Sequence, residues 1–164
     1  MILGMTTLVF VHVVISLIGI VSGIVVMAGM FGGKRLDGWT AVFLSTTVAT
    51  SVTGFLLPAH RFMPSHGVGI VSMVVLVLAI LARYAFHLAG GWRRTYIITA
   101  MIALYLNVFV LVAQAFGKVP ALKAMAPTQS EPPFLVSQIV VMALFVVFTI
   151  VAARGFRNEA VRTA

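Results

Sequence analysis

The stretch that decides the fold is GMTTLVFVHVVISLIGIVSGIVVMAGM, residues 4–30. It holds one ionisable side chain, His12, and no proline, and most of its other residues are Val, Ile, Leu, Met and Gly. A helix needs roughly 20 apolar residues to cross the hydrocarbon core of a bilayer. Strands of a membrane barrel are shorter and alternate between polar and apolar residues. The stretch therefore predicts a transmembrane helix.

Four further stretches have the same character. Charged residues and Gly or Pro breaks separate them, and they cover residues 39–57, 66–88, 95–116 and 134–153. Only helices and closed barrels satisfy the backbone in lipid, so five such runs predict an all-α integral membrane protein. We expect a five-transmembrane-helix bundle that forms one transmembrane domain over residues 1–164. The one sizeable loop, residues 117–133, is rich in proline and is expected to form an ordered turn or a lid over the bundle.

The composition excludes several function classes. The chain of 164 residues is 62% hydrophobic and 9% charged, whereas a soluble domain is nearer half apolar and a quarter charged. This excludes a soluble enzyme and a nucleic-acid-binding domain, so the net charge of +8 is interpreted as loop charge beside a lipid bilayer. Cysteine is absent, which excludes disulfides, thiolate metal sites and thiol catalysis.

The basic residues predict the orientation, because cytoplasmic loops carry an excess of Lys and Arg. Seven lie on one side of the predicted spans, namely Lys34, Arg35, Arg93, Arg94, Arg154, Arg157 and Arg162, and three lie on the other, namely Arg61, Lys118 and Lys123. This count places the N-terminus in the periplasm and the C-terminus in the cytoplasm, with the loop 117–133 outside. Arg83, inside the third stretch near its cytoplasmic end, is expected to extend to the lipid headgroups.

Polar residues at membrane depth gather toward the outer side. They are His12, His66, Asn107, Gln114 and Gln138, with Glu131 expected to approach from the loop. Imidazole binds haem iron and metal ions, so His12 and His66 are candidate metal ligands and the pair could hold a b-type haem. A quinone, or another apolar ligand with one polar end, would fit the same cluster. No acidic residue lies in a predicted span, which argues against a proton- or sodium-coupled transporter acting alone.

The same residues also have interpretations without chemistry. A histidine near a membrane surface commonly bonds a neighbour or water, and this is the expectation for His60 in a loop and His87 near the inner side. The Ser and Thr residues of the second stretch are expected to bond back to carbonyls one turn earlier. Gly19 and Gly23 form a GxxxG pattern, which favours close helix packing.

Three segments resemble known sequences. They are DGWTAVFLSTTVATSVTGF at 37–55, ALYLNVFVLVAQAF at 103–116 and APTQSEPPF at 126–134. They look like segments of small multi-pass membrane proteins of proteobacteria to which no activity is assigned. The resemblance implies a bacterial inner membrane and adds no function. The chain lacks the spaced histidine pairs within one helix that mark the cytochrome b561 and ferric-reductase families.

Three functions remain open, and the sequence favours the first. It is an accessory or assembly subunit whose partners are the lipid bilayer and either copies of itself or other membrane subunits. The second is a redox-type protein that binds haem, a metal ion or a quinone on the outer side through His12 and His66. The third is an oligomeric channel or small transporter, lined by the Ser- and Thr-rich second stretch.

Overall fold

A computed structural model describes residues 6–57 and 64–156 of the chain, and 85% of them are helical, with no strand among them. The elements are α1 (Thr7–Phe31), α2 (Asp37–Leu56), α3 (Pro64–Ile80), η1 (Leu81–Ala85), α4 (Trp92–Lys118), α5 (Pro120–Met125) and α6 (Pro132–Gly155). Element η1 is a short π-helix that continues α3. Five of these helices are long and apolar enough to cross a membrane. The predicted all-helical fold is confirmed, and each of the five predicted stretches coincides with a helix long and apolar enough to span a membrane, the third with α3 and η1 together.

The helix ends differ from the predicted spans in ways the caps explain. Helix α4 begins at Trp92 and ends at Lys118, so it includes basic residues at both ends that the apolar run left out. Helices α5 and α6 each begin with proline, which fits the first turn of a helix because the missing N–H has no partner there. The prolines thus shape the predicted loop into a short helix and a turn.

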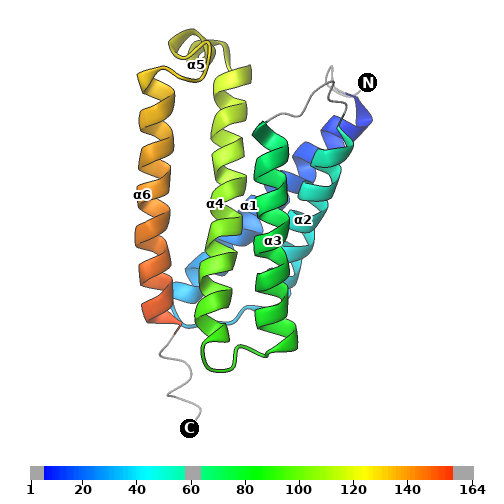
Figure 1. Ribbon diagram of the computed structural model, residues 1–164, viewed down its shortest axis with the longest axis vertical. Helices are drawn as coiled ribbons and strands as arrows, with labels where there is room; N and C mark the ends of the chain where they lie inside the picture. The colour runs from blue at the N-terminus through cyan, green and yellow to red at the C-terminus, as the bar shows by residue number, and fades with distance from the viewer. Residues whose placement is uncertain (1–5, 58–63, 157–164) are drawn as a thin grey trace.

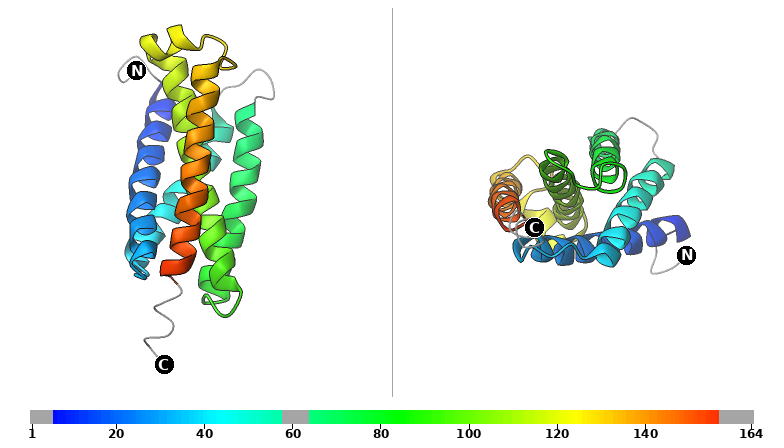
Figure 2. Two further views of the ribbon diagram at one scale, coloured as in Figure 1. Left: turned by 90° about the vertical axis from the view of Figure 1, so that its left-hand side faces the viewer. Right: turned by 90° about the horizontal axis from the view of Figure 1, so that it is seen from below.

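The long helices form an irregular bundle (Figure 1). Helix α1 begins beside the end of α2, at the same end of the bundle as α5, and α6 ends at the opposite end. Seen along the bundle, α1 is strongly tilted against α3, α4 and α6 (Figure 2). We refer to the two ends as the α5 end and the α3–α4 end. Five crossings place the start of α1 and the end of α6 at opposite ends.

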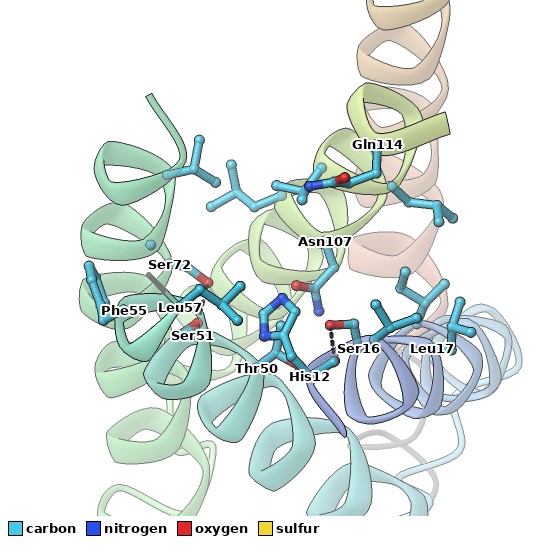
Figure 3. A pocket seen from close by; sticks show the side chains of 18 of the residues that line it. His12, Ser16, Leu17, Thr50, Ser51, Phe55, Leu57, Ser72, Asn107 and Gln114 are labelled. Atoms are coloured by element: carbon cyan, nitrogen blue, oxygen red, sulfur yellow. Dashed lines mark hydrogen bonds between the residues drawn. The ribbon is translucent and has the colours of Figure 1, made fainter. Parts of the chain in front are cut away.

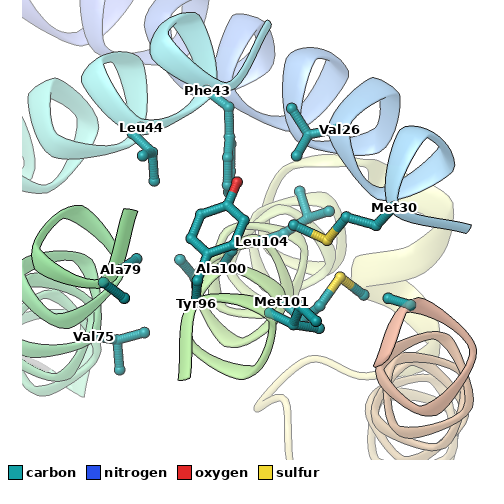
Figure 4. Packing of buried hydrophobic residues seen from close by; sticks show 14 of the residues in the cluster. Val26, Met30, Phe43, Leu44, Val75, Ala79, Tyr96, Ala100, Met101 and Leu104 are labelled. Carbon is teal, nitrogen blue, oxygen red and sulfur yellow. The ribbon is translucent and has the colours of Figure 1, made fainter. Parts of the chain in front are cut away.

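The apolar core lies in the half of the bundle toward the α3–α4 end. Its largest fully buried side chains include Tyr96, Phe43, Met30, Leu76 and Leu104. Figure 4 shows Met30 of α1, Phe43 of α2 and Tyr96 of α4 packed toward one another. Apolar surface gains little from burial when lipid surrounds it, so such helices associate through close packing at small residues. A Cβ atom at Gly23 would lie 2.6 Å from Leu104 Cδ1 and 2.9 Å from the Phe43 ring. The GxxxG interpretation of Gly19 and Gly23 therefore agrees with this contact.

Arg83 does not extend to the headgroups, contrary to the expectation from the sequence. It is 4% exposed, forms an ion pair with Asp37 and donates to the Arg35 carbonyl at 3.2 Å. Its guanidinium lies 5.2 Å from the centre of the Tyr96 ring. The residue sits in the π-helix, which widens the last turn of the third span. The carboxylate at the start of α2 and a carbonyl of the α1–α2 connection thus bind a guanidinium that the sequence analysis placed among the lipid headgroups.

Candidate functional site

A pocket of about 410 Å³ lies at the α5 end between α1, α2, α3 and α4 (Figure 3). Its volume falls in the usual range for small-molecule sites, which is roughly 300–1,000 Å³. Most of the lining is apolar, with a minority of polar side chains. The pocket and the packed core therefore occupy opposite halves of one bundle.

Four of the six candidate residues from the sequence line this pocket. They are His12 from α1, His66 from α3, and Asn107 and Gln114 from α4. Figure 3 shows His12, Asn107 and Gln114 around the same space. Asn107 and Gln114 are seven residues apart, or two helical turns, so they share a face of α4. The sequence placed both histidines toward one end of the bundle, and the structure brings them to one pocket.

His12 is held by a short chain of hydrogen bonds. Its Nδ1 lies 2.8 Å from the Thr53 hydroxyl, which itself donates to the Ala49 carbonyl at 2.7 Å. Because the Thr53 proton is engaged by the backbone, Nδ1 is assigned as the donor to Thr53 Oγ1. The neutral ring then carries its lone pair on Nε2, to which the described residues form no hydrogen bond. His12 can therefore accept a hydrogen bond or bind a metal through Nε2.

His66 lies near the start of α3, on another wall of the pocket. Its ring is 6.1 Å from the ring of Phe55, centre to centre, at a tilted angle. Phe55 in turn packs on Gly69, where a Cβ atom would lie 2.9 Å from the phenyl ring. Aromatic packing thus helps to hold His66 against the end of α2.

Asn107 ties α4 to α2 through its side chain. Its Nδ2 donates to Thr47 Oγ1 at 3.3 Å, and Thr47 Oγ1 donates to the Phe43 carbonyl at 2.7 Å. A Cβ at Gly19 would lie 3.2 Å from Thr46 Oγ1, so the glycine keeps α1 close to this bridge. The Asn107–Thr47 hydrogen bond and Gly19 lie between the pocket and the packed core.

Other polar groups line the pocket that the sequence did not predict as site residues. They are Ser16, Thr50, Ser51, Ser72 and Lys118. The hydroxyl of Thr50 is buried and has no hydrogen-bond partner within the described part of the chain, and the hydroxyl oxygens of Ser51 and Ser72 lie 3.4 Å apart. The spacing of His12 and Ser16, one helical turn apart, is the sequence signal that could have found Ser16.

The second span's hydroxyls are used mostly within α2 itself. Ser45, Thr46, Thr47, Ser51 and Thr53 each donate to the carbonyl four residues earlier. This confirms the back-bonding interpretation for these five residues. The function as a channel or transporter stays a prediction, and no observation here adds to it.

Glu131 does not reach the pocket and instead caps the turn before α6. Its carboxylate accepts from the Thr128 hydroxyl at 2.8 Å, from the Thr128 backbone N–H at 3.1 Å and from the Ser130 N–H at 3.1 Å. Desolvation raises the pKa of Glu131, but the hydrogen bonds together outweigh it and lower the pKa below its ordinary value of 4.5. The residue is therefore an ionised cap of a surface turn.

Gln138 also lies away from the pocket. It is 8% exposed on α6, and its Nε2 donates to the Phe109 carbonyl of α4 at 3.1 Å. Its Oε1 finds no partner among the residues of the described ranges. Helix α6 contributes no residue to the pocket wall, so Gln138 is a contact between α4 and α6. Periodicity along one helix could not reveal that α6 packs on the far side of α4.

The described residues contain no group of three or more His, Asp or Glu side chains that could hold a metal ion. Two histidines alone do not complete a metal site of the usual kind, which needs three or four protein ligands. His60 and Arg61, which the sequence also placed near the outer side, lie outside the described residues.

The electrostatics of the pocket are one-sided. None of the described residues that line it is acidic, whereas Lys118 and the two histidines supply the ionisable groups. Leu17 and Leu111, on α1 and α4, line the pocket and are 45% and 41% exposed at the surface of the bundle. The α1 and α4 walls of the pocket therefore extend to the outer surface of the bundle.

Comparison with known proteins adds no assignment: no family model, no curated protein and no solved structure matches the chain.

Proposed function

We propose that this chain is a multi-pass protein of a bacterial inner membrane that binds a quinone, or a ligand of the same chemistry, at the α5 end. Such a ligand has an apolar body and a head with oxygen atoms that form hydrogen bonds. The single observation that carries the proposal is the pocket itself: an apolar cavity with His12 and Asn107 in its wall. The five helices are long and apolar enough to cross a membrane, which is consistent with a ligand that partitions into lipid.

The apolar walls that α1 and α4 give the pocket support this ligand class, and we place a lateral opening between them. Leu17 of α1 and Leu111 of α4 line the pocket and are partly exposed at the surface of the bundle. A lipid-soluble molecule can enter from the bilayer through such an opening without crossing the polar surface. A water-soluble ligand would have to pass the apolar rim, which costs desolvation of its polar groups.

The polar groups match both redox forms of a quinone head. A quinone carbonyl accepts hydrogen bonds, and the side-chain amides of Asn107 and Gln114 and the ammonium of Lys118 can donate them. A quinol hydroxyl donates, and Nε2 of neutral His12 can accept. No acid lines the described pocket wall, so no carboxylate competes for these donors. The geometry supports reversible binding of a head that changes between the two forms.

Haem and metal binding stay alternatives to the quinone. A b-type haem would need His12 and His66 on opposite faces of the macrocycle, and a metal ion would need further ligands beyond these two. An absorption spectrum and a metal analysis of the purified protein separate these cases. A Soret band that His12→Ala or His66→Ala abolishes would favour haem over quinone.

The orientation and cellular role are part of the same proposal. The excess of Lys and Arg at the α3–α4 end supports a cytoplasmic position for that end, which places the pocket in the outer half of the bilayer. A ligand-binding helical bundle without an extramembrane domain in its described part suits an accessory or assembly subunit. Its partners would be other membrane subunits or further copies of the chain.

The test is ligand-dependent thermal stability in detergent. A short-chain ubiquinone analogue is titrated into the wild type, into His12→Ala and into His87→Ala, which changes an exposed histidine at the other end. A ligand that binds only the folded state raises the melting temperature as its concentration exceeds the dissociation constant. We expect stabilisation of the wild type and of His87→Ala. Binding to His12→Ala should be weaker by up to roughly tenfold, because one hydrogen bond contributes about 0.5–1.5 kcal/mol and a tenfold change corresponds to about 1.4 kcal/mol. Absence of stabilisation in the wild type would refute quinone binding.

A further inference from the structure

A second cavity, of about 280 Å³, lies at the α3–α4 end, far along α4 from the quinone pocket. It is lined by Gly90, Gly91, Arg93, Arg94, Ile97 and Ala153. Five of these residues belong to the start of α4 and the turn before it, and Ala153 belongs to α6. None of them has a part in the proposed quinone site.

The cavity has a positive charge that no acid of the described chain neutralises. Arg93 is half-buried and Arg94 is exposed. The ion pair between Arg83 and Asp37 is the one found within 4.0 Å among the described residues, so neither arginine of the cavity has an acidic partner there. Glu131, the other acid in the described ranges, is engaged at the α5 end. Two unneutralised guanidinium groups in one cavity favour an anionic occupant.

The shape of the cavity suits a headgroup rather than a side chain of the protein. Gly90 adopts a φ of +51°, and a Cβ atom at Gly90 or Gly91 would meet nothing within 4 Å, so the rim is open. The floor is apolar, because Ile97 is 1% exposed and Ala153 lies opposite on α6. The cationic rim and the apolar floor lie where α4 begins and α6 approaches its end.

We propose that this cavity binds the phosphate group of an anionic phospholipid such as phosphatidylglycerol. Basic pockets between transmembrane helices hold lipid headgroups by charge attraction, and each basic side chain near the membrane surface adds a similar share of the binding free energy. Arginine suits a phosphate because its planar guanidinium can donate two parallel hydrogen bonds. The phosphate lies between Arg93 and Arg94, and the acyl chains stay in the bilayer beside α4 and α6.

Trp92 provides a probe inside the site. It lies between Gly91 and Arg93, and the chain has two tryptophans, so Trp39→Phe leaves Trp92 as the one reporter. The protein is reconstituted into phosphatidylcholine vesicles that contain a minor share of brominated lipid, which quenches nearby tryptophan. Brominated phosphatidylglycerol should quench Trp92 at a lower lipid share than brominated phosphatidylcholine.

Matched variants separate the site from general charge attraction. Arg93→Gln with Arg94→Gln should raise the half-quenching share of phosphatidylglycerol by about fivefold for each charge removed. Lys34→Gln with Arg35→Gln also removes two positive charges at the α3–α4 end, and it should leave the half-quenching share of phosphatidylglycerol unchanged. Arg93→Lys with Arg94→Lys should weaken binding less than the glutamines do, because charge remains while the two-bond geometry is lost. Unchanged quenching by brominated phosphatidylcholine shows that each variant is still inserted.

Three results would overturn the lipid site. Equal quenching by the two brominated lipids in the wild type would show no headgroup preference. An equal loss in the Lys34/Arg35 double variant would show attraction by overall charge. A shift of Trp92 emission with inorganic phosphate alone, in detergent without phospholipid, would show a site for free phosphate instead.

Discussion

The two halves of the bundle are built from the same four helices and differ in what fills the space between them. Toward the α3–α4 end, Gly23 brings α1 against Phe43 and Leu104, and the core side chains are almost fully buried. Toward the α5 end, α1 tilts away from α4, and the space between them is the pocket lined by His12 and Asn107. Packing in one half holds the helices so that they can diverge in the other. A substitution in the packed half should therefore lower stability and leave ligand binding intact. A substitution in the half that holds the pocket should weaken ligand binding and leave stability nearly unchanged.

The largest effect is expected where a charge is buried in the packed half. Asp37→Asn leaves Arg83, at 3% side-chain exposure, without its carboxylate partner. Removing one partner of a buried pair costs about 3–5 kcal/mol, and because Asp37 is 80% exposed to its surroundings we expect about 2 kcal/mol of lost stability. The double variant Arg83→Met with Asp37→Asn should recover part of that loss. The measurement is the free energy of unfolding in mixed detergent micelles.

The control for this pair is Arg35→Gln, because Arg83 donates to the backbone carbonyl of Arg35, which this substitution keeps. It should leave stability unchanged. Equal stability of Asp37→Asn and the wild type would show that the ion pair contributes nothing to the fold.

A matched pair of alanines compares the two halves directly. Gly23→Ala places a methyl group 2.6 Å from Leu104 Cδ1, and neither Leu104 nor Phe43 has room to move, since each is 1% exposed. Overpacking of this kind costs about 1–3 kcal/mol. Gly54→Ala, beside the pocket, places the methyl group 3.5 Å from His12 Cε1, an ordinary contact. It should be neutral or slightly stabilising, since alanine favours helix more than glycine by up to about 1 kcal/mol.

Thermal unfolding of the two variants in the same detergent measures this difference. Equal losses would contradict the division of the bundle into a packed half and an open half.

Filling the pocket should remove binding with a small effect on stability. Ser16→Leu adds apolar volume to the pocket wall and removes a hydroxyl that donates to the His12 carbonyl at 2.7 Å. We expect the quinone analogue to lose its stabilising effect, while the melting temperature without ligand changes by the equivalent of less than about 1 kcal/mol. Ser45→Leu changes an exposed hydroxyl on α2 away from the pocket and should retain binding. Retained binding in Ser16→Leu would place the ligand elsewhere.

The smallest effect concerns the turn before α6. The pKa of Glu131 is lowered by its hydrogen bonds, so the cap stabilises the turn above pH 4.5, the ordinary value, and this contribution is lost as the pH falls through the lowered pKa. Hydrogen exchange at the Thr128 and Ser130 amides should accelerate, relative to the unprotected rate, as the pH falls below about 4.5. Glu131→Gln should show weak protection at every pH. Protection in the wild type that does not change with pH would exclude the carboxylate as the cap.

The sequence predicted the five helices from five long apolar stretches, because the hydrocarbon of a bilayer cannot form hydrogen bonds with the backbone and so leaves few alternatives to a helix. It also predicted that His12 and His66 lie toward the same end, since odd and even spans run in opposite directions. It did not predict that Arg83 is buried, because the π-helix and the partner carboxylate of Asp37 depend on the tertiary structure. Gln138 was assigned to the cluster by depth alone, and depth does not tell which side of α4 a neighbouring helix packs on.

The bond between Thr53 and His12 makes the imidazole depend on the backbone of α2. The hydroxyl of Thr53 points its hydrogen at the Ala49 carbonyl, and only then can its oxygen receive the hydrogen of Nδ1. Bending α2 at that turn would release the hydroxyl to rotate, and the ring could then hold its hydrogen on either nitrogen. A partner protein that binds α2 from outside and bends it could in this way change which nitrogen of His12 accepts a hydrogen bond from the ligand, without contacting the pocket.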